Sequence, residues 1–207
     1  MDFSALPSLD VVQETMEAVK VRGISVELLA TRKEALDRLK SLIPAGASVM
    51  TGASLTLREI GFEALLLSKA HPWRNLKDDI VAEKDPARQS LLRKQSLLAD
   101  YFLGSVHALT RTGQLLIASA TGSQLGPYAF SSSNIIWVVG IQKITRTVEE
   151  GIQRIREHIM PHEEERMRVM TEGKMGTMLG KLLIIEREAP FLGRTLRLLL
   201  VRERVGD

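Results

Sequence analysis

Short apolar segments alternate with longer amphipathic segments along this chain, and this alternation restricts its fold more than any other feature. Apolar residues recur at spacings of three and four over Leu9–Val21, which predicts a helix, and residues 24–29 predict a short strand. The pair Thr31 and Glu34 has the spacing of a capping box and begins a second predicted helix. Strands separated by helices are typical of an α/β domain with a parallel sheet.

The pattern continues to the end of the chain. Residues 135–140 are almost wholly apolar, which indicates a strand covered on both faces. A long helix is predicted from Pro86 to about Tyr101. Residues 181–187 and 195–203 predict two strands joined as a hairpin. The sequence therefore predicts one α/β domain over residues 1–207, with a largely parallel sheet flanked by helices and a C-terminal hairpin.

Composition excludes several classes of function. The net charge is only +3 and aromatic residues make up 4% of the chain, which argues against nucleic acid as a partner. The chain has no cysteine, so it can form no disulfide and offers no thiolate to an iron–sulfur cluster. No apolar run approaches the ~20 residues of a membrane span, and the N-terminus does not resemble a signal peptide. We therefore expect a cytoplasmic protein without a membrane partner.

A first candidate binding loop follows the strand predicted at residues 47–50. Gly52, Ser54 and Thr56 combine a flexible turn with two hydroxyls at the predicted start of a helix. Backbone amides and hydroxyls in this arrangement can hold a phosphate or a carboxylate. The loop lacks the lysine of a P-loop. A helix cap after a tight turn is the structural alternative.

A second candidate loop contains Thr121, Gly122 and Ser123, between two predicted strands. A long loop of small polar residues inside a compact domain is often functional, although a plain surface loop would have the same composition. Both loops follow strands, and ligands of α/β folds bind at the carboxyl ends of strands. We therefore expect the two loops to face one crevice and to bind a small anionic metabolite.

Three further groups of residues have chemistry of interest. His107, expected on a strand, is the candidate proton-transfer residue, with a pKa near neutrality; a hydrogen-bonded core histidine is the alternative. His158 and His162 have the spacing of helical zinc ligands, but Pro161 lies between them, so no metal site is predicted. The methionines of residues 167–178 are interpreted as a packing surface; they are Met167, Met170, Met175 and Met178.

Four segments resemble the lactate-utilisation (LUD) domain family. They are residues 99–115, which read ADYFLGSVHALTRTGQL, residues 120–123 with residues 136–144, and residues 52–61, which match the family's glycine–serine–threonine motif. The match runs in order along essentially the whole chain. It implies a single α/β domain akin to the superfamily of sugar-phosphate isomerases and CoA transferases. It also implies a link to bacterial lactate oxidation, alongside iron–sulfur partner proteins.

Carried over by position, the resemblance makes Gly52, Ser54 and Thr56 phosphate or carboxylate binders, opposed by Thr121, Gly122 and Ser123. The chain departs from its relatives in the turn 110–113, where they often carry an acid and this chain has none. A glutamyl intermediate at this turn is therefore excluded. His107 stands where relatives often have asparagine. Residues 167–178 lack the cysteines that some relatives carry, which argues against a bound cluster.

Two classes of function fit these observations. The chain either has a site, catalytic or not, for a small phosphorylated or carboxylated metabolite, or it is a non-enzymatic accessory subunit of an iron–sulfur lactate-oxidising complex. The sequence leaves open whether the protein is catalytic, which cofactor it uses, which substrate it binds and how many copies associate.

Overall fold

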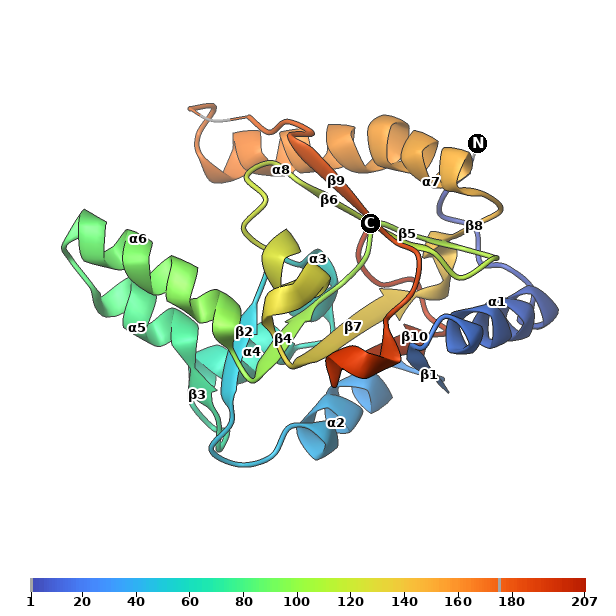
Figure 1. Cartoon of the computed structure of the whole chain (residues 1–207). Helices are drawn as coiled ribbons and strands as arrows, with labels where there is room; N and C mark the ends of the chain where they lie inside the picture. The colour runs from blue at the N-terminus through green and yellow to red at the C-terminus, as the bar shows by residue number, and fades with distance from the viewer. Residues whose placement is uncertain (1, 175) are drawn as a thin grey trace.

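The computed structural model describes residues 2–174 and 176–207 and contains two sheets with helices packed on their outer faces (Figure 1). The larger sheet is wholly parallel, in the order β1 (Ser25–Leu29), β10 (Thr195–Val201), β7 (Asn134–Gly140), β4 (Tyr101–Gly104), β2 (Ser48–Thr51) and β3 (Arg74–Asn75). The smaller sheet has the order β8 (Ile144–Thr145), β5 (Ala108–Thr110), β6 (Leu115–Ser119) and β9 (Lys181–Ile185). The predicted α/β class with a largely parallel sheet is confirmed.

The helices connect the strands and cover the sheets. The α-helices are α1 (Leu9–Val21), α2 (Arg32–Leu42), α3 (Leu55–Glu59), α4 (Phe62–Ser68), α5 (Leu76–Ala82), α6 (Pro86–Gln95), α7 (Val148–Arg154) and α8 (Met160–Met170). Short 3₁₀ or π turns are η1 (Ser96–Leu98), η2 (Pro127–Ser131), η3 (Ile141–Lys143), η4 (Ile155–Ile159) and η5 (Pro190–Leu192). No helix among the described residues is long and apolar enough to cross a bilayer.

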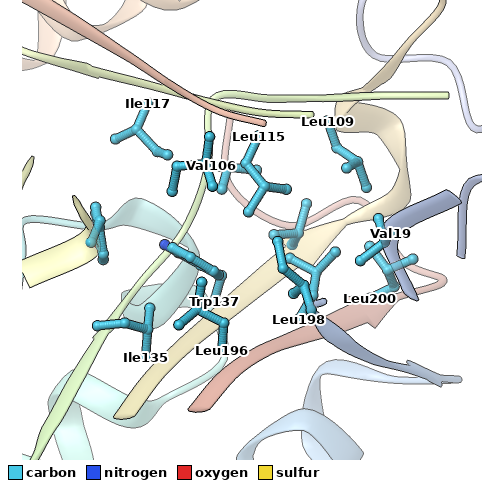
Figure 2. Packing of buried hydrophobic residues seen from close by; sticks show 14 of the residues in the cluster. Val19, Val106, Leu109, Leu115, Ile117, Ile135, Trp137, Leu196, Leu198 and Leu200 are labelled. Atoms are coloured by element: carbon cyan, nitrogen blue, oxygen red, sulfur yellow. The ribbon is translucent and has the colours of Figure 1, made fainter. Parts of the chain in front are cut away.

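The core is built from the two faces of the central strands β7 and β10, whose successive side chains point in opposite directions. Trp137 and Leu198 pack on one face with Leu115 of the smaller sheet, so that the largest apolar cluster lies between the sheets (Figure 2). Val138 packs on the opposite face with Leu39 of α2. Burial on both faces explains why these strands are apolar throughout.

The smaller sheet is covered on its outer face by the long helical segment α7–η4–α8 (Figure 1). Leu116 and Ala108 of this sheet pack there with Ile155. A Cβ atom at Gly151 would lie 2.9 Å from Leu116 Cδ2 and 3.2 Å from Ala108 Cβ, so glycine lets α7 approach the sheet closely. Pro161 does not end this segment: η4 runs into α8 without a break, and the proline, which has no N–H to donate, lies just after the π turn.

The predicted C-terminal hairpin is wrong. β9 pairs antiparallel with β6 in the smaller sheet, whereas β10 lies between β1 and β7 in the larger sheet and is parallel to both. The connection between them crosses from one sheet to the other and is held by backbone hydrogen bonds from Glu188 N to Arg22 O (2.9 Å) and from Thr195 N to Ser133 O (2.9 Å). Two apolar segments separated by a turn are compatible with a hairpin and also with strands in two different sheets, so the sequence pattern does not distinguish the two.

The helix predicted to reach Tyr101 also ends earlier. α6 stops at Gln95, one 3₁₀ turn follows, and Tyr101 begins β4. Asp100 fixes this change of direction, because its carboxylate accepts hydrogen bonds from the backbone N (2.9 Å) and hydroxyl (2.7 Å) of Ser48 in β2. The N-terminal predictions were more accurate, since α1 spans the predicted residues and Thr31 Oγ1 accepts from Glu34 N (3.2 Å).

Candidate functional site

A cavity of about 520 Å³ is lined by residues that follow strands β2, β4, β6 and β7. Met160 and Glu163 of α8 line another side of it. The cavity therefore occupies the carboxyl ends of the neighbouring parallel strands β2, β4 and β7, the usual ligand position in open α/β sheets, and β6 of the smaller sheet adds a further wall. Its volume suits a small molecule.

The first predicted loop lies on the wall of this cavity. Gly52, Ser54 and Thr56 all line it. Ser54 is also the N-cap of α3, where its hydroxyl accepts a hydrogen bond from Leu57 N at 3.2 Å. The helix cap that was the structural alternative for this loop is therefore present, and Ser54 lines the cavity as well. The side chain of Thr56 is almost fully buried, with 1% exposed.

The second predicted loop lies opposite the first. Thr121 and Ser123 line the same cavity, whereas Gly122 does not. Gly122 has a φ of +87° and forms the turn itself, with its N–H donating to Ser119 Oγ at 2.9 Å. The two loops touch, because a Cβ atom on Gly52 would lie 3.4 Å from Gln124 Cβ. The structure thus brings five of the six predicted binding residues to one cavity and assigns Gly122 a role in the backbone.

His107 lines the cavity as well, but it precedes β5 rather than lying on it. Its Nδ1 accepts a hydrogen bond from Ala118 N at 3.1 Å, which leaves the proton of the neutral ring on Nε2. Burial, reinforced by the positive charges of Lys143 and Arg154, lowers the pKa of His107 to about 3. The expected pKa near neutrality is therefore wrong, and at neutral pH His107 offers an N–H donor.

The sequence reasoning missed Lys143, the most unusual side chain of the site. Lys143 ends η3, directly after β7, and only 4% of it is exposed. Its Nζ donates to Thr56 Oγ1 at 3.1 Å and to Ser105 Oγ at 3.3 Å. Burial and the charge of Arg154 lower the pKa of Lys143 to about 7, against the opposing effects of Asp207 and Glu59. A lysine directly after a buried strand was the available signal.

Arg154 is a second buried cation near the cavity. It is 0% exposed, and its Nη1 donates to His107 O at 2.8 Å. No hydrogen-bond partner for its Nε or Nη2 occurs among the described residues. Burial lowers the pKa of Arg154 to about 10, so it stays charged at neutral pH. Its charge accounts for part of the lowered pKa values of both Lys143 and His107.

The last described residues close the cavity near Lys143. Gln142 Nε2 donates to the carbonyl oxygens of Val205 (3.0 Å) and Gly206 (3.1 Å), and Gly206 N donates to Glu59 Oε2 (2.8 Å). Gly206 has a φ of +66°, and a Cβ atom there would lie 2.9 Å from Lys143 Nζ. These contacts place Asp207 on the cavity wall.

The helical histidines and methionines lie at the margin of the site. The rings of His158 and His162 meet edge to face, with centroids 4.4 Å apart, and Asp207 Oδ1 lies 3.6 Å from His162 Nδ1. Met170 and Met178 line the cavity but are 62% and 68% exposed, so the predicted packing role is not seen at these two residues. Met175 lies outside the described residues.

The depressed pKa of His107 predicts a measurable acid sensitivity. Between about pH 6.5 and pH 3 the unfolded state binds a proton at His107 that the folded state does not, so this residue lowers the free energy of unfolding as pH falls. His107→Asn should therefore lose less stability than the wild-type protein from pH 7 to pH 4, as measured by urea denaturation. The exposed His162→Asn is the control. A constant difference between His107→Asn and wild type across this range would contradict the burial of a neutral ring.

The fold and the cavity define an α/β protein with a cavity at the carboxyl ends of parallel strands. The family model described as the LUD domain matches residues 12–176, and the chain belongs to this family. Membership supports the expected association with lactate utilisation in general.

A solved structure has a fold similar to that of this chain. The crystal structure of a DUF162 family protein from Deinococcus radiodurans superimposes with a TM-score of 0.53 at 13% identity, covering 95% of this chain and 98% of that chain. DUF162 is the LUD domain family, and at this identity the likeness shows the fold alone. No curated protein matches this chain in sequence.

Proposed function

We propose that this LUD-family protein binds a small phosphorylated or carboxylated metabolite in the cavity, as part of the utilisation of lactate or another organic acid. The observation that carries the proposal is the buried amine of Lys143, which lines the cavity and is hydrogen-bonded to Thr56 and Ser105. A buried amine costs folding free energy, and an anionic ligand would compensate that cost.

The remaining wall of the cavity also suits an oxygen-rich anion. Hydroxyl donors surround it; they are Ser54, Thr56, Ser105, Ser119, Thr121, Ser123 and Thr177. Its charged side chains are Arg58, Lys77, Lys143 and Arg166 against Glu63, Glu163 and Asp207. Arg166 is engaged by Glu163, with Nε and Oε2 2.6 Å apart. Lys77, whose pKa is lowered by burial against the opposing charge of Glu63, also lines the cavity and is a candidate cation for a second anionic group.

A relationship to the sugar-phosphate isomerases and CoA transferases is part of the proposal, and the glycine–hydroxyl loop after β2 supports it. A glutamyl mechanism at the turn 110–113 finds no support. This turn has no carboxylate and packs against α1, where a Cβ atom at Gly113 would lie 2.8 Å from the backbone carbon of Ala18. None of its residues lines the cavity.

Thermal-shift measurements with lactate, pyruvate, sugar phosphates and CoA species test the proposal. A ligand at 100 times its Kd adds about 2.7 kcal/mol to the free energy of unfolding. This corresponds to a rise in Tm of about 5–11 °C for a chain of this size. We expect one chemical class to give such a shift, and Lys143→Met and Gly52→Leu to remove it.

The exposed Lys94 of α6 supplies the matched control, because Lys94→Met removes an amine far from the cavity lining and should keep the full shift. A shift that survives in Lys143→Met would overturn the assignment of this site. A flat panel with folded wild-type protein would favour the accessory-subunit function, and co-purification with iron–sulfur proteins would then be the deciding measurement.

A further inference from the structure

The surroundings of Lys143 distinguish it from an ordinary structural lysine. In the described part of the chain no carboxylate lies within ion-pair distance of its Nζ, which is held by two hydroxyls, Thr56 and Ser105. These hydroxyls are also hydrogen-bonded to each other, with Thr56 Oγ1 donating to Ser105 Oγ at 3.2 Å. A buried lysine kept for stability would be paired with an acid, whereas this amine donates to two hydroxyls that can themselves exchange protons.

The charges around Lys143 come from three directions. Arg154 of α7 disfavours the ammonium form, while Glu59 of α3 and Asp207 near the end of the chain favour it. Burial outweighs the two acids, so the pKa is about 7 and about half of the amine is neutral at pH 7. His107 is neutral and adds no charge. A neutral, desolvated amine in a cavity is a nucleophile.

We propose that Lys143 forms an imine with a small carbonyl compound that carries an anionic group, either a 2-oxo acid or a phosphorylated aldose. The inference rests on the proposed function, because the same cavity must hold the anionic group. It adds the reacting atom and the chemical class of the substrate.

The reaction balances without an oxidant or a reductant. The nitrogen lone pair of Lys143 forms a bond to the carbonyl carbon, the carbonyl π electrons move to oxygen, and a proton passes from nitrogen to that oxygen to give a carbinolamine. The lone pair on nitrogen then forms the C=N bond as the C–O bond breaks, and the oxygen leaves as water after accepting a second proton. The nitrogen loses its remaining hydrogen to replace that proton, so both hydrogens of the neutral amine end in the water. Ser105 and Thr56, within hydrogen-bond distance of Nζ, can relay both protons.

The cavity matches the other half of such a substrate. Lys77 lines it and supplies a cation for the carboxylate or phosphate, and the N–H of His107 supplies a donor. Ile159 and Met160 add apolar surface for the carbon skeleton. An imine at Lys143 would therefore form inside a pocket that also recognises the anionic end of the molecule.

Reductive trapping tests the inference on the full-length protein. The chain is incubated at pH 7 with glyoxylate, pyruvate or glyceraldehyde 3-phosphate and sodium cyanoborohydride, and the modified lysine is located by peptide mass spectrometry. We expect Lys143 to be modified at least about tenfold more than any other lysine, because its amine is buried in the cavity that would hold the anionic end of the probe. The three probes separate 2-oxo acids from aldose phosphates.

Two variants and two further ligands complete the design. Lys143→Met should lose the dominant adduct, and the exposed Lys94→Met should keep it. Lactate and glycerol 3-phosphate, which have the anionic group but no carbonyl, should still raise Tm in the wild-type protein and leave no adduct.

The outcomes separate this inference from the proposed function. Dominant labelling of Lys143 supports the inference. Equal labelling of exposed lysines and Lys143 by every probe overturns it. A thermal shift with lactate or glycerol 3-phosphate and no adduct from any carbonyl probe overturns the inference and preserves the anion site. Absence of both the shift and the adduct overturns both.

Discussion

Lys143→Met is expected to be more stable than the wild-type protein at pH 6, and the difference should shrink as pH rises toward 10. The pKa of Lys143 is about 7 in the folded protein, below its ordinary value of 10.5, because the amine is buried beside Arg154. Between these values the unfolded state binds a proton that the folded state does not, so the wild-type protein gains stability with rising pH. Below pH 7 the folded protein carries a buried charge, which costs up to about 5 kcal/mol.

Urea denaturation of both proteins from pH 6 to pH 10 measures this effect. Lys94→Met, which removes an exposed lysine, should run parallel to the wild-type curve and controls for the loss of one positive charge. Parallel curves for Lys143→Met and wild type would mean that Lys143 titrates as an ordinary lysine, and would remove the electrostatic argument for a neutral amine in the cavity.

Gly104→Ala is expected to destabilise the protein by about 3 kcal/mol or more, a loss at the upper end of the range for overpacked cores. Gly104 ends β4, and a Cβ atom there would overlap the hydroxyl of Tyr128 and lie 3.0 Å from Tyr128 Cζ. Tyr128 is 1% exposed and packs against Phe102 and Trp137, with ring centroids 5.2 Å and 5.4 Å away, so it has little room to move.

The Tyr128→Phe change gives this prediction an internal check. It removes the atom that the new methyl group would meet, so the double variant should recover part of the lost stability. Alone it should be neutral or mildly stabilising, because the buried Tyr128 hydroxyl has no hydrogen-bond partner among the described residues. Gly126→Ala is the matched control: its nearest neighbour, Leu97 Cδ1, would lie 3.7 Å from the new Cβ. Equal Tm values for both alanine variants would contradict the packing argument.

The elements predicted correctly are those whose signals are local. The capping pair Thr31 and Glu34 and the apolar spacing of α1 depend on neighbours within a few residues, and both occur as expected. β4 was missed because its residues extend the apolar pattern of the preceding helix. The hairpin error has another cause: strand pairing is decided by residues far away in the sequence, and β10 pairs with β1 and β7 through contacts that no turn can specify.

The candidate site divides in the same way. Gly52, Ser54 and Thr56 were recognisable because a strand, a turn and a helix start follow one another. The pKa of His107 could not be predicted, because it depends on burial and on Lys143 and Arg154, which lie 36 and 47 residues away in the sequence. Lys143 was overlooked for the same reason: its burial and its hydroxyl partners come from other elements of the fold.

The position of β10 has a consequence for biosynthesis. The first strand, β1, is at the edge of the larger sheet and pairs with β10, about 170 residues later in the chain. A nascent chain therefore exposes the apolar faces of β1 and β7 until residues 195–201 have left the ribosome. The larger sheet can be completed only after β10 has been made, and during that interval chaperones would have an open sheet edge to bind.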